Sequence, residues 1–600
     1  MFQKWLEHNK LSDYFFSTRL FPPASDRAFW EKTIGKEAAS EAEAYLGYSW
    51  PLILATQFME FQISGNRLVQ EIPHFARRFA LTALFLGELS EGKGRFLPDI
   101  TDGIFLICEE SYWGLSAHNI TARKKDLLPR ADDPYIDLFA AETAELLAVI
   151  YHVLYEELKN FCPLILDRIE YELDRRILTP YQNHYDFFWM GYRNTTVNNW
   201  NAWITSNILT VLLLFPQRKT RHEQILNKLF AEIQKYYDSI PSDGGCDEGS
   251  SYWTKAGAKL FSFCDLLYRT TDGQINFFCD PKLKEIALYE ARVWIDGCRF
   301  VNFGDGNGSV NVLLDYSLFG FGERIGEPSL CQLAAVLKKN RKKTSFSELF
   351  RGCGIKEILF SYCFKEKIDA IPPMTAPKRS ILPNLQNAVL REGAWLLAAK
   401  GGHNKENHNH NDVGSFLLYH EGKPLLIDPG CGTYTRQTFG PERYTIWTMQ
   451  SAWHNLPTVG TYDQLVGAEF KAEHFDLCDQ TLEISFSEAY PPEAGLKEVR
   501  RFLTLTEEGL FWRDRFVFKK DPLPITENLI TLYSPQKHER GLLLGDAFLL
   551  ETDLPWEAQY LDFNKDAKLE NSWETKGLWR IRLMGDGKEK AEFTFHVRKL

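Results

Sequence analysis

The densest group of polar side chains that could do chemistry lies in the segment 403-HNKENHNHNDVGSF-416. Asparagines and histidines alternate there directly before an apolar run. If the segment is extended, His408 and His410 project to the same side, because side chains alternate along a strand with a period of two. A surface turn capped by Asp412 is the structural alternative. Polar groups beside a buried strand are costly unless they are partnered, and this favours a functional site.

A second set of residues has the chemistry of a metal site. Asp428 closes the apolar run 424-PLLID-428, and His454 lies in 450-QSAWHNLPTV-459. Two imidazoles and a carboxylate are a standard ligand set for a divalent transition metal, with zinc as the first expectation. The spacing is not that of a zinc finger, and an aspartate at a strand end is commonly a turn former. Both interpretations stay open from the residues alone.

A glycine-rich turn precedes a further candidate. In 243-DGGCDEGSSYWTKAG-257 the chain passes through Glu248 into a helix that bears Tyr252. Such a turn presents a tyrosine to a cleft, but it also serves as an ordinary helix start, where a negative charge such as that of Glu248 is favourable.

Asparagines open another helix in 194-NTTVNNWNAW-203. Asn198 and Asn199 are capping candidates first and functional amides second. The segment 109-EESYWGLSAHN-119 places Trp113 and His118 before a possible helix, either lining a cleft or packed in a core.

Two common nucleophile or phosphate motifs are missing from the sequence. In 303-FGDGNGSVN-311 the glycines fit a tight turn, and the lysine of a phosphate-binding loop is absent. No G-x-S-x-G turn is present, so serine-hydrolase chemistry lacks its nucleophile.

The elements that carry these residues fall into two regions. From about residue 35 to 340 the apolar spacing is helical, which predicts helices over 53–65, 136–161, 203–215 and 282–297. Short alternating runs separated by turn residues then predict strands over 388–400, 415–428, 509–519 and 578–585.

A proline-rich stretch beginning at residues 371–373 separates the two patterns. Helices followed by strands predict an α+β multidomain chain, with helical residues 1–375 and an antiparallel β-sandwich over 376–600. Successive amphipathic helices joined by short loops indicate a bundle, solenoid or toroid.

Composition excludes several classes of function. The 600 residues carry a formal net charge of -11, which argues against nucleic-acid binding. The eleven cysteines are scattered, which favours a reduced compartment. Neither a signal-like apolar segment nor a membrane-length apolar run is found. We therefore expect a cytoplasmic protein, or a periplasmic or secreted one if a signal peptide has been removed, and no membrane partner.

Together these motifs resemble one known family. The runs HNHNDVGSF, LLIDPGCGTYTR and SAWHNLPTV, with DGGCDEGSSYW and VNNWNAW upstream, resemble the heparinase II/III-like polysaccharide lyases, especially the exo-acting branch of polysaccharide lyase family fifteen. The resemblance covers about residues 40 to 470 in matching order. It implies a helical (α/α) toroid followed by an antiparallel β-sandwich, with the substrate bound between them.

The resemblance also implies roles for individual residues. Tyr252 and His408 become the catalytic pair. Asn198 becomes the contact to the uronate carboxyl group, and Asn199 stands where several relatives carry histidine. His410, Asp428 and His454 fall at a structural metal site, which we expect to hold zinc, with no organic cofactor. Further substrate contacts are expected from Trp113, His118, Trp200, Glu248, Tyr434, Arg436 and Arg443.

The resemblance implies β-elimination of an acidic oligosaccharide, which leaves a 4,5-unsaturated uronate, and the branch it resembles implies an exolytic mode. Heparin, heparan sulfate and alginate types of substrate stay open, as do the oligomeric state, monomer or homodimer, and the division of acid and base roles between Tyr252 and His408. A glycoside hydrolase on the same scaffold is one alternative, and it needs two separated carboxylates. A non-catalytic glycan-binding protein is the other.

Overall fold

The structure is a computed structural model that describes residues 1–600 except 122–125, 194–196, 216–218, 311–313, 343–352 and 373. The chain divides into two compact units. The first comprises Met1–Ile240, Thr254–Ala287 and Asn311–Pro373, and the second comprises Pro241–Trp253, Leu288–Val310 and Met374–Leu600.

Two segments that precede residue 375 therefore belong to the second unit. The sequence predicts one cut at residue 375, whereas residues 241–253 and 288–310 pack with the later strands. Hydrophobic periodicity identifies a helix or strand but not the unit on which that element packs. The sequence alone therefore does not show that these two segments belong to the second unit. The asparagine-rich segment at 194 is described from Val197 onward, because residues 194–196 lie outside the described residues.

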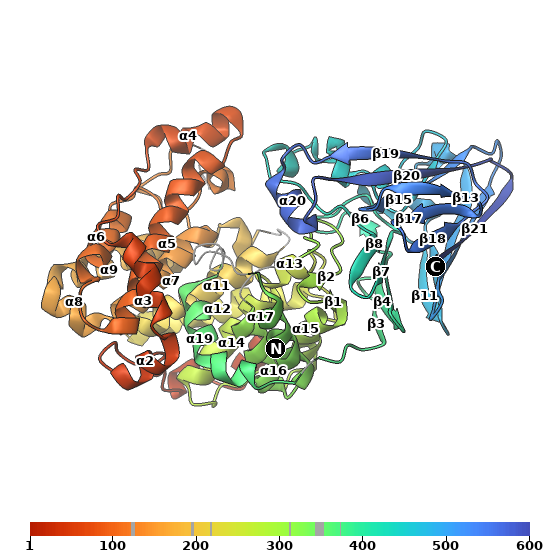
Figure 1. Ribbon diagram of the computed structural model, residues 1–600. Coiled ribbons are helices and arrows are strands. Elements are labelled where there is room, and N and C mark those ends of the chain that lie inside the picture. Colours follow the sequence, from red (N-terminus) through yellow and green to blue (C-terminus); the bar gives the residue numbers. More distant parts are fainter. Residues whose placement is uncertain (122–125, 194–196, 216–218, 311–313, 343–352, 373) are drawn as a thin grey trace. The chain divides into compact units, whose positions relative to one another are not determined.

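Helices make up the first unit (Figure 1). They are α1 (Phe2–Leu6), α2 (Arg27–Ile34), α3 (Glu37–Ala42), α4 (Ala55–Ser64), α5 (Leu68–Glu91), α6 (Leu97–Cys108), α7 (Leu138–Val153), α8 (Tyr155–Phe161), α9 (Pro163–Leu173), α10 (Thr179–Asn183), α11 (Asn199–Leu214), α12 (Lys219–Ser239), α14 (Gly257–Thr270), α16 (Asp315–Ile325), α17 (Pro328–Asn340) and α19 (Ile355–Asp369). Helix α15 (Pro281–Val293) begins in the first unit and ends in the second.

The predicted helices correspond to observed ones with shifted ends. The segment 136–161 is divided at Leu154 into α7 and α8, which are bent by 81°. Helix α11 begins before the predicted 203–215, because Asn198 is its N-cap and accepts a hydrogen bond from the backbone N of Trp200 at 3.2 Å. The cap residue thus sets where the helix starts, and apolar spacing does not report it.

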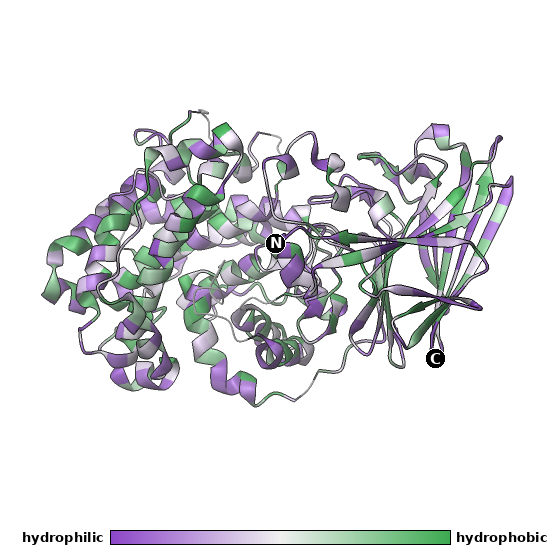
Figure 2. Ribbon diagram, turned by 45° about the horizontal axis from the view of Figure 1, so that its top comes forward, coloured by the Kyte–Doolittle hydropathy of each residue, from purple (hydrophilic) through white to green (hydrophobic). Residues whose placement is uncertain are grey.

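Burial of apolar faces holds these helices together. Helix α11 packs against α7, α12 and α14 and is buried along almost its whole length. In Figure 2 the helices of the first unit carry hydrophobic stretches along one side and hydrophilic ones along the other. Among the described residues no single helix is long and apolar enough to cross a membrane, and α7 and α8 reach that length and composition only when joined across their bend.

Strands make up most of the second unit (Figure 1). They are β1 (Trp294–Asp296), β2 (Arg299–Phe300), β3 (Arg379–Leu382), β4 (Asn387–Glu392), β5 (Trp395–Lys400), β6 (His403–Asn404), β7 (Phe416–His420), β8 (Lys423–Leu426), β9 (Pro457–Val459), β10 (Gly467–Lys471), β11 (His474–Cys478), β12 (Thr481–Ser485), β13 (Leu496–Thr506), β14 (Gly509–Phe518), β15 (Ile525–Thr531), β16 (Pro535–His538), β17 (Gly541–Leu544), β18 (Phe548–Glu551), β19 (Trp556–Asp562), β20 (Gly577–Gly585) and β21 (Lys590–Lys599). Two short helices, α13 (Ser250–Trp253) and α20 (Ala567–Trp573), accompany them.

These strands form antiparallel sheets that share one core. The larger sheets have the orders β3-β4-β5-β7-β8, β11-β12-β13-β14-β21-β18-β17-β16 and β19-β20-β15-β9. Leu397, Trp512 and Leu529, one from each of these sheets, belong to the same buried hydrophobic cluster. Sheets that bury their inner faces against one another form a β-sandwich, so the predicted helix-then-strand order is confirmed.

The predicted strands correspond to observed strands with similar bounds. The run 388–400 is the hairpin β4-β5, and 415–428 contains the hairpin β7-β8. The runs 509–519 and 578–585 correspond to β14 and β20.

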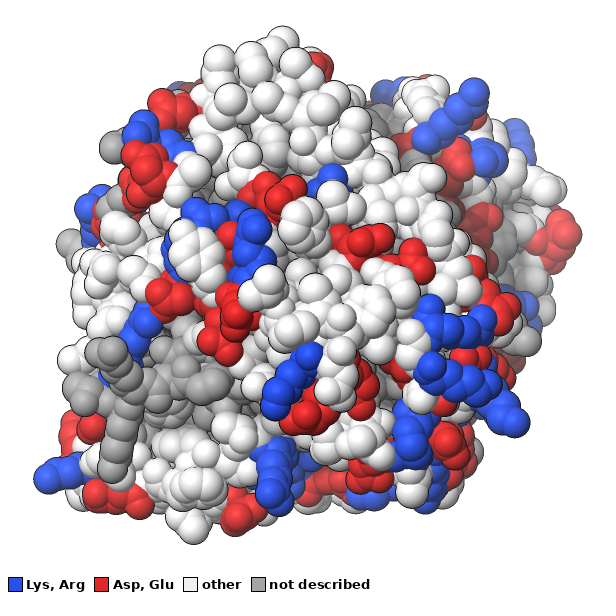
Figure 3. Space-filling view, turned by 90° about the vertical axis from the view of Figure 1, so that its left-hand side faces the viewer, with Lys and Arg blue, Asp and Glu red and all other residues white. Residues whose placement is uncertain are grey.

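Charge is mixed on the face of the molecule seen in Figure 3, where lysine and arginine side chains alternate with aspartate and glutamate. Among the described residues of this face the basic side chains form no continuous surface.

Candidate active site

A buried carboxylate lies at the centre of the candidate site, within the second unit. Asp305 is 1% exposed, and its carboxylate takes part in four hydrogen bonds. Its Oδ2 lies 2.7 Å from His408 Nδ1 and accepts from Tyr434 Oη at 3.1 Å. Its Oδ1 lies 3.0 Å from His410 Nε2 and accepts from Arg443 Nη2 at 2.7 Å. One aspartate therefore orients side chains from two segments, the one between β6 and β7 and the one between β8 and β9.

The partners of Asp305 keep it ionised. Burial alone would raise the pKa of this carboxyl group, but hydrogen bonds from His408 and His410 and their charges hold the pKa well below its usual value. A carboxylate beside Nδ1 favours the tautomer in which Nδ1 carries the proton. Nε2 of His408 then offers its lone pair, which is the form a general base requires.

Tyr252 faces His408 from the helix α13. The two rings stack at a centroid distance of 4.3 Å and an interplanar angle of 29°. The Tyr252 hydroxyl is hydrogen-bonded to the hydroxyl of Tyr434. Burial, and next the charge of Asp305, raises the pKa of Tyr252 well above its ordinary value of about 10. The phenol therefore stays protonated at neutral pH and is suited to donate its proton.

Backbone geometry places His408 in this position. His408 adopts a left-handed conformation with φ 53°, and its carbonyl oxygen accepts a hydrogen bond from the backbone N of Asp305 at 3.2 Å. Gly304 has φ 67°, and a Cβ atom there would lie 2.9 Å from the same carbonyl oxygen. A non-glycine residue in the left-handed region is strained and is often found at functional sites. Gly304 thus permits the close approach of two loops.

Hydrogen bonds between loops fix the segment that carries Tyr252. Asp247 Oδ2 accepts from the side chain of Asn407 at 2.7 Å, which ties this segment to the one that carries His408. Asp243 Oδ2 accepts from the backbone N of Asn384 at 2.7 Å. Glu248 is 4% exposed, and its Oε2 lies 3.8 Å from His408 Nε2. The catalytic candidates are therefore held by neighbours that the sequence separates by more than 130 residues.

The three predicted metal ligands come together beside this group. One ligand atom from each of His410, Asp428 and His454 lies within 4.8 Å of the others, and all three residues are fully buried. His454 Nδ1 lies 2.9 Å from Asp428 Oδ2. His410 Nδ1 is buried without a hydrogen-bond partner among the described residues. An unpartnered imidazole nitrogen next to a second imidazole and a carboxylate fits a divalent metal ion.

The two arginines predicted to contact substrate are placed differently. Arg443 is bound by Asp305 and by the backbone oxygens of Asn409 and Thr438, and its side chain is 11% exposed. Its charge is thereby balanced inside the site. Arg436 is exposed to solvent. Tyr434, predicted as a substrate contact, bridges Tyr252 and Asp305.

Four further candidates belong to the first unit. Asn198 caps α11 through its side-chain oxygen, which leaves its NH2 group as a donor. Asn199 is 6% exposed. The ring of Trp200 lies 4.6 Å from that of His118, whose Nδ1 is 2.7 Å from Asp137 Oδ2. Their predicted roles stay predictions.

Trp113 is too deeply buried to make the substrate contact that was predicted for it. Its side chain is 1% exposed, its Nε1 donates to the carbonyl oxygen of Ile107 at 2.7 Å, and the guanidinium of Arg176 lies 4.8 Å from its ring. A fully buried ring cannot stack on a sugar, so Trp113 packs in the core. Tryptophan suits both environments, and the segment around it lacks the periodicity that would separate them.

Sequence analysis did not identify Asp305. A tight turn is what the sequence predicts for 303-FGDGNGSVN-311, and an aspartate between two glycines is common in such turns. The one available signal was the pair Gly304 and Gly306, since glycines on both sides of a carboxylate allow close approach of other backbones. A Cβ atom at Gly306 would lie 2.9 Å from the Cα of Asn302.

Part of the second unit matches a known protein family. Residues 377–521 match the family described as Heparinase II/III-like, C-terminal. They form a heparinase II/III-like C-terminal domain. This domain supplies His408, His410, Asp428 and His454, whereas Tyr252 and Asp305 come from the earlier segments of the same unit. The predicted resemblance to the heparinase II/III-like polysaccharide lyases is thus confirmed.

Solved structures resemble the chain over most of its length. A heparinase III matches with a TM-score of 0.62 and 14% identity, over 88% of this chain and 76% of that one. The heparan sulfate lyase HepC from Pedobacter heparinus matches with a TM-score of 0.59 and 12% identity, over 100% and 87%. A Paenibacillus xanthan lyase has a TM-score of 0.54 and 10% identity, over 95% and 57%. The fold, a helical toroid followed by a β-sandwich with the heparinase II/III-like domain in it, is confirmed.

No curated protein matches the chain in a sequence comparison.

Proposed function

We propose that this protein is a polysaccharide lyase that cleaves uronate-containing acidic glycans by β-elimination. The observation that carries the proposal is the stacked pair of Tyr252 and His408, oriented by the buried Asp305. The heparinase II/III-like domain and the resemblance to structures named heparinase III and heparan sulfate lyase support it.

Elimination requires a base for the C5 proton of the uronate. His408 suits this role because Asp305 at its Nδ1 favours the tautomer with a free lone pair at Nε2. Asp305 also stabilises the imidazolium that forms when the proton is taken.

Elimination also requires an acid for the leaving oxygen O4. Tyr252 suits this role because its pKa is raised, so that it holds its proton until the C4–O4 bond breaks. Using Tyr252 as the base would require a positive charge to stabilise the phenolate. The nearest cation in its hydrogen-bond network, Arg443, is already paired with Asp305.

The proposed step is balanced in protons and electrons. The C5–H bond breaks and its proton goes to His408 Nε2, while the electron pair forms the C4=C5 double bond. The C4–O4 bond breaks, and O4 takes the phenolic proton of Tyr252. The imidazolium then returns a proton to the phenolate, directly or through water, which restores both groups.

The uronate carboxylate opposes the carbanion that forms beside it, so donors must offset its charge. The NH2 groups of Asn198 and Asn199 are the amide donors that the sequence offers for this purpose. The proposal includes an exolytic mode of cleavage and a uronate polymer of the heparin, heparan sulfate or alginate type as the substrate.

A structural metal ion completes the proposal. His410, Asp428 and His454 would hold it, and zinc is the ion that suits two imidazoles and one carboxylate. Bound there, the ion would cross-link the segment between β6 and β7 to both ends of the segment between β8 and β9, and it would add no chemistry to the proton transfers. Its contribution is to keep the backbone around His408 in place.

The two alternatives have less support. A glycoside hydrolase needs two carboxylates free to act on either side of the bond. Among the described residues of this site, Asp305 is fully engaged by its four partners, so Glu248 lacks a free counterpart. A non-catalytic glycan-binding protein would not need the protonated phenol beside a tautomer-controlled imidazole.

The proposal is tested with the Tyr252→Phe variant. We expect the wild type to release products that absorb near 232 nm, the band of an unsaturated uronate, from at least one polymer in a panel of heparin, heparan sulfate, alginate and related uronates. Tyr252→Phe should lower that rate at least ~100-fold, because general acid catalysis contributes about 10²–10⁴. Tyr560→Phe, on the partly exposed strand β19, is the control.

Two outcomes would contradict this proposal. In the first, Tyr252→Phe retains the full wild-type rate. In the second, the wild type generates new reducing ends on these polymers without absorbance near 232 nm.

A further inference from the structure

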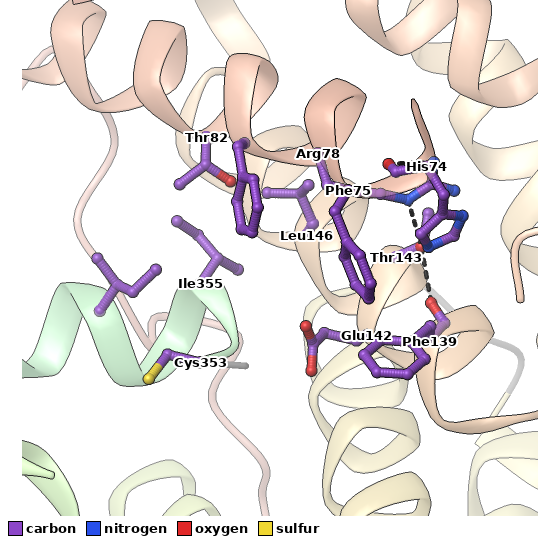
Figure 4. A pocket seen from close by; sticks show the side chains of 12 residues that line it. His74, Phe75, Arg78, Thr82, Phe139, Glu142, Thr143, Leu146, Cys353 and Ile355 are labelled. Atoms are coloured by element: carbon purple, nitrogen blue, oxygen red, sulfur yellow. Dashed lines mark hydrogen bonds between the residues drawn. The ribbon is translucent and has the colours of Figure 1, made fainter. Parts of the chain in front are cut away.

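The pocket shown in Figure 4 is too small for a sugar. It lies in the first unit between α5, α7 and the start of α19 and leaves a cavity of about 40 Å³, which is room for water. Its carboxylate, Glu142, accepts a hydrogen bond from Trp203 Nε1 at 3.1 Å, and the positive charges of Lys255 and Lys259 act on it. The charge of Glu142 is therefore offset within the first unit.

In the second unit, the short helix α20 docks on a loop of the candidate site. Trp573 Nε1, at the end of the helix, donates to the carbonyl oxygen of Pro429 at 3.0 Å. Asp566, the N-cap, accepts from the backbone N and the hydroxyl group of Thr433 at 2.8 and 3.0 Å. Pro429 and Thr433 belong to the segment between β8 and β9, which also carries Tyr434. Both ends of α20 are thus fixed to a segment that contributes to the candidate site.

This helix brings a cation to Tyr434. Lys568 is the second residue of α20, and its ammonium Nζ lies 4.1 Å from the centroid of the Tyr434 ring. No ion pair or hydrogen bond of this ammonium is found in the part of the chain that the structure describes, and the residue is half-buried. A partly desolvated charge without a partner is costly, and an anionic ligand would offset that cost.

The carboxylates around this ammonium are already engaged. Both oxygens of Asp566 accept hydrogen bonds from the segment that holds Tyr434 or from the start of α20 itself. Asp305 is engaged by its four partners, and one of these, Arg443, is thereby balanced. Lys568 thus adds a positive charge beside the site that these pairs leave available.

An exposed aromatic ring lies next to the same tyrosine. Phe439 is 57% exposed, and its ring meets those of Tyr434 and His408 edge-on at centroid distances of 5.1 and 6.2 Å. Single exposed apolar side chains are common on protein surfaces, so the position of this ring matters more than its exposure. It offers a flat apolar surface beside the proposed base, and the C–H face of a sugar ring packs on such a surface.

We propose that Phe439 and Lys568 form a subsite for an acidic sugar next to the bond that is cleaved. The Phe439 ring packs on the C–H face of this sugar, and the Lys568 ammonium binds its carboxylate or sulfate group. Both residues lie next to Tyr434, whose hydroxyl bonds Tyr252, so the subsite adjoins the proposed acid. Neither residue takes part in the proton transfers. The choice of a sugar as the ligand rests on the proposed lyase function.

Binding measured apart from cleavage tests the subsite. The probes are tetrasaccharides from alginate and from heparin, each used intact and with its carboxyl groups reduced to alcohols. They are titrated calorimetrically into the full chain carrying Tyr252→Phe, which prevents turnover. In this background Lys568→Gln should weaken binding of the intact probes at least ~5-fold at about 50 mM NaCl, and less at about 200 mM, because salt screens the ion pair. Lys568→Arg should bind within about 2-fold of its parent, because it keeps the charge.

The reduced probes identify the anion that Lys568 binds. If the anion is a carboxylate, Lys568→Gln has no effect on a reduced probe. If it is a sulfate group, the effect persists with the reduced heparin probe. The reduced alginate probe carries no charge, so an equal loss of its binding in Lys568→Gln would overturn the assignment. Binding of neither intact probe to the parent chain would overturn the subsite.

The variant Phe439→Ala separates stacking from charge. It should weaken binding of intact and reduced probes alike, by at least ~5-fold, because packing on a ring does not depend on the charge of the sugar. Two matched controls should change neither: Phe161→Ala, which removes an exposed ring at the end of α8, and Lys520→Gln, which removes an exposed charge after β14. Unchanged affinity in Phe439→Ala or in Lys568→Gln would contradict the assignment of that residue.

Kinetics separate the subsite from the lyase function. With Tyr252 intact, Lys568→Gln should raise KM at least ~5-fold on a cleaved polymer and keep kcat within about 2-fold, because it removes binding shared by the ground and transition states. A fall in kcat at unchanged KM would overturn the subsite, since Lys568 would then act on Tyr434. If no polymer yields an unsaturated product while the probes show these binding losses, the lyase function fails and the subsite stands. If elimination occurs with wild-type KM in both variants, the subsite fails and the lyase function stands.

Discussion

At the scale of single residues, the candidate site depends on one aspartate that orients several side chains. Asp305 fixes the tautomer of His408 and holds Tyr434, which in turn bonds Tyr252. Tyr252 and His408 were predicted from the resemblance of their segments to the heparinase II/III-like lyases, and the structure brings their two rings together. The sequence was insufficient for Asp305, since an aspartate between glycines is common in turns that have no function.

The close approach at Gly304 gives a prediction at this scale. In Gly304→Ala the new Cβ would lie 2.9 Å from the carbonyl oxygen of His408, so the loops must separate and His408 must shift. We expect kcat to fall at least ~10-fold, since small displacements of a catalytic group reduce rates strongly. The matched control is Gly326→Ala, which has a similar φ of 70° but no atom within 4 Å of the added Cβ. A wild-type kcat in Gly304→Ala, measured by absorbance near 232 nm, would show that this contact does not position His408.

At the scale of elements, the loops that carry Tyr252 and His408 are held together by hydrogen bonds between side chains far apart in the sequence, which local sequence patterns do not predict. The helices and strands themselves were predictable because burial imposes periods of 3.6 and 2 on the apolar residues. The ends of the helices were less predictable, because a cap or a break depends on a single residue. Asn198 caps the start of α11, and Leu154 marks the end of α7. Partners such as Asp247 and Asn407 are separated by 160 positions, and no local pattern joins them.

Helix α15 supplies a prediction on stability and pH. Glu290 is 0% exposed, neither of its carboxyl oxygens has a hydrogen-bond partner among the described residues, and burial raises its pKa well above the usual value. The protonated form is therefore favoured by folding. Its contribution is fully present below the unfolded pKa of about 4.5 and is lost as the pH rises toward the folded pKa.

The measurement compares Glu290→Gln with the wild type in denaturant unfolding from pH 4.5 to pH 8. The variant should gain in unfolding free energy relative to the wild type by about 1.4 kcal/mol for each pH unit in the range between the two pKa values. Glu507→Gln, at an exposed turn, should show no such trend. A difference between Glu290→Gln and wild type that does not vary with pH would contradict the assignment of a buried, protonated Glu290.

At the scale of the whole molecule, the chain is two units whose sequences are interleaved, so that the heparinase II/III-like domain receives Tyr252 and Asp305 from segments that precede it. The three residues that could hold a metal ion, His410, Asp428 and His454, all lie within the second unit. Because a metal ion binds the folded state preferentially, it stabilises that state.

Metal removal is therefore expected to act on stability. Dialysis against a chelator should lower the Tm of the second unit by several degrees, and zinc should restore it. Asp428→Asn, which removes one proposed ligand, should show a low Tm that the chelator does not reduce further. Elemental analysis that finds no metal in protein purified without chelator, together with a Tm that the chelator leaves unchanged, would contradict the metal site.

The central claim is that the glycosidic bond breaks by elimination and not by addition of water. The most direct test is cleavage of a defined uronate oligosaccharide in H₂¹⁸O, with the products weighed by mass spectrometry. Elimination breaks the bond between C4 and O4, so we predict one product that is lighter by one water than the hydrolysis product, with no ¹⁸O incorporated into either fragment at the time of cleavage. Products that are fully hydrated and carry one ¹⁸O from the solvent would contradict the account and establish a hydrolase.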